Sequence, residues 1–192
     1  MDKDTLEQVQ GELFPSAGHC MVMGTASTMA SITEALGMML PGLAAIPAPN
    51  SKRLRLAEES GRRIVEMVEE GLTPDKIMTR EAFENAIRVL MAVGGSTNAV
   101  VHLPAIAGRL GIELPLSLFD ELSRTTPHIA GVRPSGGEFL MEDLAAAGGI
   151  AAVMKELEPL LNASAMTVTG KTVTENLAGE KGAQPWQEVI HP

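Results

Sequence analysis

The sequence has a single cysteine, Cys20, which excludes a disulfide scaffold and favours a reducing compartment. Aromatic residues make up only 3% of the 192 residues, so the core must consist of aliphatic side chains and methionines. No apolar run approaches the ~18 residues that a membrane helix needs, because Pro41, Pro47 and Pro49 interrupt the most apolar segment. Residues 1–12 are charged and lack the apolar segment of a signal peptide. We therefore expect a soluble, cytoplasmic protein.

Basic residues are in the minority, and the formal net charge is −9. An acidic chain repels phosphate groups, so we expect neither nucleic acid nor a membrane as a partner. Hydrophobic residues make up 45% and charged residues 20% of the chain, which is the balance of a globular domain. The length suits one domain or part of a larger one.

Helical periodicity dominates the chain. The clearest helix covers residues 51–70 and ends at Gly71, and its small and apolar residues share one face with charges opposite, as in a helix that packs on a core. That face consists of Leu54, Ala57, Gly61, Ile64, Val65 and Val68. Further helices are predicted over residues 4–13, 25–39, 98–110, 117–124, 139–147 and 150–161, and from residue 79 to the glycines at 94 and 95.

Strands are few and short, with residues 128–132 and 166–169 as the candidates. Isolated strands need sheet partners. The expected fold class is therefore α/β, predominantly helical in this segment, with part of the sheet missing.

Cys20 lies between Gly18 and Gly24, just before a predicted helix start. The positive end of a helix dipole favours the thiolate, which is the form that binds iron or attacks an electrophile. The commoner fate of an unpaired cysteine is a small buried hydrophobe, and composition alone leaves that alternative open. One thiol cannot hold an iron–sulfur cluster, which takes several. His19 is interpreted as a polar neighbour of the site rather than a ligand.

Two glycine-containing loops are further candidates. Residues 94–98 precede a helix whose free N–H groups suit a carboxylate or phosphate, although a plain turn with a Ser or Thr cap is commoner. Residues 134–137 are followed by Glu142 and Asp143, which favour a solvated helix start over an acid–base pair. His102 and His128 have apolar neighbours, so we interpret both as core histidines rather than ligands.

Taken together, these segments resemble the dihydroxy-acid, phosphogluconate and sugar-acid dehydratase family over residues 6–177. Several motifs in the right order make the resemblance specific, and residues 18–27 look closer to the sugar-acid branch than to the branched-chain amino-acid branch. The motifs are GHCMVMGTASTMA at 18–30, TREAFENA at 79–86, GGSTNA at 94–99, TPH at 126–128, PSG at 134–136, MEDL at 141–144, AGG at 147–149 and TVTGKT at 167–172.

The resemblance implies a hydro-lyase that removes water from a 2,3-dihydroxy carboxylic acid or sugar acid and releases a 2-keto acid. In that family an iron–sulfur cluster (2Fe-2S or 4Fe-4S) is the Lewis acid for the departing 3-hydroxyl, Mg²⁺ holds the carboxylate end, and the subunits form dimers or tetramers. Cys20 matches the last of the three cluster cysteines. The resemblance further implies that substrate-binding or site-lining residues are His19, Thr25, Ser27, Ser96, Thr97 and Asn98.

The resemblance also implies that residues 1–178 form part of an N-terminal αβα domain, and that the tail at 179–192 leads toward a C-terminal domain. The two other cluster cysteines, the Mg²⁺ ligands, the modified lysine and the catalytic serine have no match in this sequence. We therefore assign no catalytic residue and expect both cofactor sites to be incomplete in the isolated chain, which would be an inactive fragment. The alternatives are a non-catalytic interaction module, one part of a split dehydratase and, most remotely, an enzyme with Cys20 as nucleophile.

Overall fold

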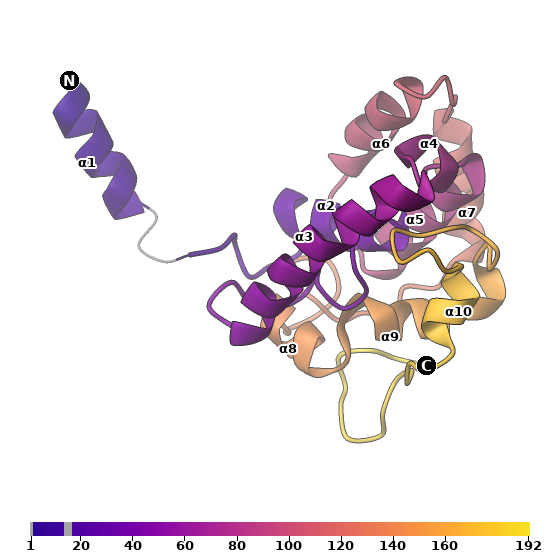
Figure 1. Ribbon diagram of the computed structural model, residues 1–192. Coiled ribbons are helices and arrows are strands. Elements are labelled where there is room, and N and C mark those ends of the chain that lie inside the picture. Colours follow the sequence, from indigo (N-terminus) through magenta and orange to yellow (C-terminus); the bar gives the residue numbers. More distant parts are fainter. Residues whose placement is uncertain (1, 14–16) are drawn as a thin grey trace.

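The structure is a computed structural model that describes residues 2–13 and 17–192. Figure 1 shows the helices gathered around a common centre, with α1 standing apart from them. In chain order the elements are α1 (Lys3–Leu13), α2 (Thr25–Ala35), α3 (Ser51–Glu70), α4 (Pro74–Ile77), α5 (Arg80–Ala92), α6 (Ala99–Gly108), α7 (Leu116–Thr125), α8 (Met141–Ala146), α9 (Gly149–Glu156), the 3₁₀ helix η1 (Glu158–Leu160) and α10 (Val173–Leu177). Within the described ranges, no helix is both long and apolar enough to cross a membrane.

Helix α5 forms the centre of the core and packs against α2, α6, α7 and α9. Its side chains are buried around most of its circumference, and Phe83, Ile87 and Val89 are fully inaccessible. Local sequence sets its start, because the Thr79 hydroxyl accepts a hydrogen bond from the Ala82 N–H at 3.4 Å. The charged residues Arg80, Glu84 and Arg88 share one side of α5, and the wide apolar face opposite them is stable only inside the protein, which explains the central position of the helix.

The ends of α3 agree with the prediction from the sequence. The Asn50 side chain accepts a hydrogen bond from the Lys52 N–H at 2.9 Å, which caps the N-terminus of the helix. Gly71 ends it in the left-handed conformation, with φ of 62°. Both signals are local, so they do not depend on what the helix packs against.

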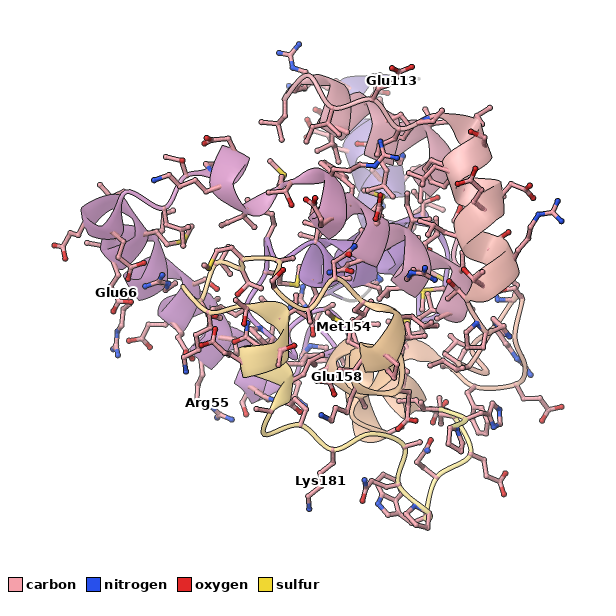
Figure 2. The ribbon with its side chains drawn as sticks, turned by 90° about the vertical axis from the view of Figure 1, so that its right-hand side faces the viewer. Arg55, Glu66, Glu113, Met154, Glu158 and Lys181 are labelled. Carbon is pink, nitrogen blue, oxygen red and sulfur yellow. The ribbon has the colours of Figure 1, made fainter. Side chains whose placement is uncertain are left out.

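The orientation of α3 differs from the prediction. Met67 is buried against the body, and Arg63 is anchored there by donating from Nε to the Val168 carbonyl at 2.5 Å. The predicted core-facing residues are instead exposed: Leu54, Ala57, Gly61, Ile64, Val65 and Val68. Figure 2 shows Arg55 and Glu66 of the same helix projecting away from the body. The helix thus packs on the body along one flank of its apolar stripe, where the hydrogen bond from Arg63 to Val168 holds it. The ion pairs of Arg63 are with Glu66 and Glu70 of the same helix.

The two predicted strands are buried or turned segments rather than strands. Residues 129–132 are buried as expected, but they form only two isolated bridges, Ala130 to Ile190 and Val132 to Phe139. Met166 bridges Thr172 across a tight turn. The part of the chain that the structure describes therefore contains isolated bridges in place of a sheet. The segment is predominantly helical, as predicted, and the described residues do not show the sheet that an α/β class would require.

Several helices are shorter than their periodicity suggested. Helix α2 ends at Ala35 instead of residue 39, because Gly37 turns with φ of 81° and an added Cβ would come within 2.8 Å of the Met166 carbonyl oxygen. Helix α9 ends at Glu156, and the continuation toward residue 161 is the 3₁₀ helix η1. Helix α7, in contrast, is slightly longer than predicted, because it begins at Leu116 directly after Pro115 rather than at a Ser117 cap.

The tail at 179–192 lacks helices but is ordered at its end. Ile190 is buried, and its neighbours join the body through two backbone hydrogen bonds: Gly131 N–H to the Val189 carbonyl and His191 N–H to the Ile129 carbonyl, both at 2.8 Å. The division into a domain at 1–178 and a connecting tail remains a prediction.

Candidate functional site

The segment that carries His19 and Cys20 is fastened to the first turn of α2. The Ser27 hydroxyl is buried and lies 2.8 Å from the Val22 carbonyl oxygen and 3.2 Å from that of Cys20. One ring nitrogen of His19, Nδ1, lies 3.0 Å from the Cys20 carbonyl and 3.2 Å from the Ser27 hydroxyl. These contacts hold the backbone of Cys20 while its side chain stays exposed. The alternative of a buried, purely structural cysteine is therefore wrong.

The loop at 94–98 lies against the same helix start. Thr28 is fully buried, and its hydroxyl accepts a hydrogen bond from the Ser96 N–H at 2.9 Å. The Asn98 side chain donates to the Thr25 hydroxyl at 2.6 Å. Close approach requires glycine at position 95, because a Cβ there would lie 2.8 Å from the Thr28 methyl group. The two motifs, about 70 residues apart in sequence, therefore form one surface.

A third loop joins this surface. The Ser135 hydroxyl donates a hydrogen bond to the Gly94 carbonyl oxygen. The His128 ring lies against both glycine loops, since an added Cβ at Gly94 or at Gly136 would come within 2.7 Å of its ring atoms. His128 is exposed, and so is His102 on α6, so the prediction that both are core histidines is wrong. Apolar neighbours in sequence did not reveal that both side chains face outward.

The structure brings the predicted site residues to one edge. His19 and Cys20 precede α2, Thr25 and Ser27 lie in its first turn, and the loop at 94–98 adds Ser96 and Asn98. Thr97 lies in that loop and is exposed. The sequence did not identify Thr28 or Ser135, although each hydroxyl lies inside a motif that carries the resemblance. The edge presents a thiol, hydroxyls, an amide and an imidazole, which suit a polar ligand.

The carboxylates at 142 and 143 stand at the start of α8, whose Met141 N–H donates to the Met21 carbonyl at 2.7 Å. Asp143 accepts a hydrogen bond from the Leu140 N–H at 2.7 Å and so caps the start of α8. The prediction of a helix start is confirmed there, and an acid–base pair is not formed because Glu142 projects into solvent.

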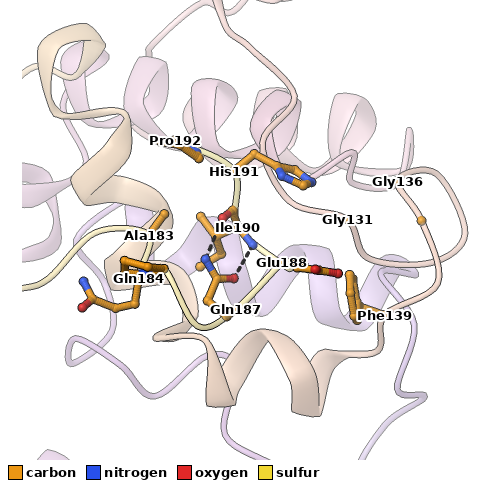
Figure 3. Close-up of a pocket in the computed structure, with 12 residues that line it drawn as sticks. Gly131, Gly136, Phe139, Ala183, Gln184, Gln187, Glu188, Ile190, His191 and Pro192 are labelled. Atoms are coloured by element: carbon orange, nitrogen blue, oxygen red, sulfur yellow. Dashed lines mark hydrogen bonds between the residues drawn. The ribbon is translucent and has the colours of Figure 1, made fainter.

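A separate hollow of about 500 Å³ lies between the tail and the loop that contains Gly131 and Phe139. Figure 3 shows Gln187 bonded to Ile190 within the tail beside it, with Phe139 and His191 on other sides. None of the predicted site residues lines this hollow. Its shape follows from the tail folding back on the body, so the hollow does not define the site.

Comparison with known proteins shows the family to which this chain, with its Cys20 edge, belongs. The model of the dihydroxy-acid/6-phosphogluconate dehydratase N-terminal family matches residues 1–176. The dihydroxy-acid dehydratase of Methanococcoides burtonii is 55% identical over 92% of this chain and 32% of its own length. The dihydroxy-acid dehydratase of Ignicoccus hospitalis is 53% identical over 98% of this chain and 34% of its own length. The chain belongs to the dihydroxy-acid/6-phosphogluconate dehydratase family.

This dehydratase-family chain matches one part of each relative. The chain spans about a third of the length of the curated relatives, including that of Methanothermobacter thermautotrophicus, which is 49% identical over the whole chain and 35% of its own length. All three relatives carry the name dihydroxy-acid dehydratase. They give no support to the closer likeness to the sugar-acid branch inferred from residues 18–27.

Cys20 is the one residue of this chain that could supply a thiolate to an iron–sulfur cluster. Cys20 is exposed beside the polar edge. Over residues 2–13 and 17–192, no group of three or more His, Cys, Asp or Glu side chains is placed to hold a metal ion. Because a cluster takes several thiolates, the described residues do not complete its ligand set. We therefore derive no catalytic step through the cluster or Mg²⁺.

Replacing Thr28 with Val tests how the two motifs are held together. The substitution keeps the shape but leaves the Ser96 N–H without its acceptor, so we expect the free energy of unfolding to fall by about 1–3 kcal/mol. Urea denaturation measures the change. Thr33→Val on the same helix is the control, because the Thr33 hydroxyl bonds only to the Met29 carbonyl one turn earlier. Equal effects of the two substitutions would show that the contact with Ser96 does not hold the loop.

Proposed function

We propose that the protein carrying this segment is a hydro-lyase that converts a 2,3-dihydroxy carboxylic acid to a 2-keto acid. The observation that carries the proposal is the family match together with an exposed Cys20 at the polar edge. Names of the relatives support a dihydroxy acid as substrate, with a sugar acid as the alternative. A lone thiol and an acidic surface support a cytoplasmic protein that does not bind nucleic acid.

In this proposal Cys20 supplies one thiolate ligand of an iron–sulfur cluster. The bound cluster would supply a Lewis acid, which polarises an oxygen of the substrate. The role of Ser27 and His19 is to position the ligand, because their contacts fix the Cys20 carbonyl and so the direction in which the thiol leaves the backbone.

The remaining hydroxyl and amide groups of the edge would contact the polar substrate. Thr25 and Asn98 are already paired with one another at 2.6 Å, which fixes the rotamers of both before the substrate arrives. Ser96 and Thr97 lie beside them on the same loop. Preorganised groups of this kind lower the entropic cost of binding. We assign neither a general base nor a Mg²⁺ ligand to the described residues.

The isolated chain is proposed to be inactive because it holds one thiol of the several that a cluster requires. A split dehydratase, in which other polypeptides supply the missing ligands, is compatible with the same edge. A purely non-catalytic interaction module is the alternative from another class, and the exposed apolar stripe of α3 is the observation that favours it.

The proposal is tested by turnover in a protein of the relatives' full length that carries this segment. Anaerobically reconstituted protein is supplied with a branched 2,3-dihydroxy acid or with a sugar acid, and formation of the 2-keto acid is followed. We expect turnover of the dihydroxy acid. Turnover of the sugar acid alone would show that the substrate is a sugar acid. Binding of partners without any turnover would favour the interaction module.

A further inference from the structure

Side chains from outside hold the loop at 94–98, the site loop, at every second residue. Helix α2 supplies the hydroxyls that bond to Ser96 and to Asn98, at 2.9 and 2.6 Å. The bond at the first residue of the loop comes from elsewhere, because the Ser135 hydroxyl donates to the Gly94 carbonyl oxygen. The site loop is therefore tied to α2 on one side and to the loop of Ser135 on the other.

The backbone around Ser135 is itself fixed by hydrogen bonds. The Gly136 N–H donates to the Val132 carbonyl at 3.0 Å. The Arg133 N–H donates to the Phe139 carbonyl at 2.9 Å. Ser135 is exposed, but its hydroxyl thus extends from a backbone whose position is already set.

The loop at 133–141 is also bonded to the Cys20 segment at both of its ends, through two backbone hydrogen bonds of 2.7 Å. One runs from the Met23 N–H to the carbonyl of the first residue of the loop, and the other from the N–H of its last residue to the Met21 carbonyl. Ser135 lies between these two ends. Its side chain therefore connects the site loop to the backbone beside Cys20.

The His128 ring limits how closely the two loops can approach. A Cβ added at Gly94 would come within 2.7 Å of its Nε2 atom, and a Cβ added at Gly136 would come equally close to the same ring. The ring thus fills the gap between the site loop and the loop of Ser135. It keeps the two loops from closing further, while the Ser135 hydrogen bond keeps them from separating.

We propose that Ser135 is a positioning residue of the hydro-lyase, which holds the site loop at a fixed spacing from Cys20. The inference rests on the proposed function, in which a cluster bound by Cys20 and the polar groups of the site loop act on the same substrate. Ser135 acts through the site loop, because its hydroxyl proton is committed to the Gly94 carbonyl. An exposed hydrogen bond of this kind adds little to global stability, so its effect lies in the position of the loop.

Kinetics of Ser135→Ala in a protein of the relatives' full length test this role. We expect KM for a branched 2,3-dihydroxy acid to rise about fivefold and kcat to stay within about twofold, because the site loop must then be ordered at each binding event. Ser135→Thr keeps the hydroxyl and should restore KM. Ser123→Ala on α7 is the matched control and should change neither constant, since it also removes an exposed hydroxyl that donates to a backbone carbonyl, at 2.8 Å.

Hydrogen exchange tests the position of the site loop without any turnover. In the 192-residue chain, Ser135→Ala should speed exchange of the Ser96 and Ala99 amides about fivefold, because both are hydrogen-bonded in the held loop. Amides of α7 should keep their wild-type rates. Ser135→Thr should return the two amides to wild-type exchange.

A KM that Ser135→Ala leaves unchanged would overturn the proposal, as would unchanged exchange in the site loop or a Ser135→Thr variant that behaves like alanine. A wild type without turnover would instead refute the proposed hydro-lyase function. Hydrogen exchange would then decide alone whether Ser135 holds the site loop.

Discussion

Replacing Glu34 with Ala lowers the free energy of unfolding by about 2–4 kcal/mol. The Glu34 carboxylate is buried within α2 and accepts hydrogen bonds from the N–H groups of Gly42 at 2.8 Å and Ala44 at 2.9 Å. Alanine would leave both donors without an acceptor and open a cavity. Relief of the buried charge offsets only part of this loss. Urea denaturation at neutral pH measures the change.

The Glu34 carboxylate should also make the stability of the protein depend on pH. Burial raises the pKa of Glu34 from 4.5 to about 6, against the opposing effect of the Gly42 and Ala44 hydrogen bonds. The folded protein therefore holds this proton more tightly than the unfolded chain does. Its contribution to stability is fully present below pH 4.5 and is lost as the pH rises through 6, a change of about 2 kcal/mol.

Glu34→Gln is the matched control because it keeps the size of the side chain and removes the titration. We expect the wild type to lose unfolding free energy relative to Glu34→Gln as the pH rises from 4 to 7. A difference that is constant over this range would contradict the assignment of a raised pKa to Glu34.

Under the proposed function, we expect Cys20→Ser to abolish hydro-lyase activity in a protein of the relatives' full length that carries this segment. Changes to the outer shell of a metal site already cost about 10–100-fold in affinity or activity, so loss of a ligand is expected to exceed about 100-fold. The rate of 2-keto acid formation measures the loss, and bound iron and sulfide should fall in parallel. His19→Gln is the control: it alters a contact of the Cys20 backbone without removing the thiol, so its effect should be smaller. Full activity in Cys20→Ser would remove Cys20 from the ligand set.

The ends of helices were predictable where the signal is local. Helix α3 begins at Ser51 and ends at Gly71 as expected, since a helix end depends on a few neighbouring residues. The face that α3 buries was not predictable in this way. Arg63 reaches the Val168 carbonyl, more than 100 residues away, and its anchoring turns the apolar stripe outward. Periodicity identifies an apolar stripe but not whether this chain or another molecule covers it.

The candidate site, too, was predictable from the sequence only in part. Composition and spacing did not decide whether Cys20 is a metal ligand or a buried hydrophobic residue. Only the family resemblance connected it with the loop at 94–98. The structure supplies the physical link through Thr28 and Ser96, and through Thr25 and Asn98. His128 was misjudged because exposure depends on how the loops at 94 and 136 pack around it.

The most direct test of the account is anomalous diffraction at the iron absorption edge from crystals of the cluster-loaded protein of full length. We predict an iron peak within bonding distance of the Cys20 sulfur, at the edge where Ser27, Thr25 and Asn98 meet. Iron bound elsewhere, with the Cys20 thiol free, would contradict the assignment of Cys20 as a cluster ligand.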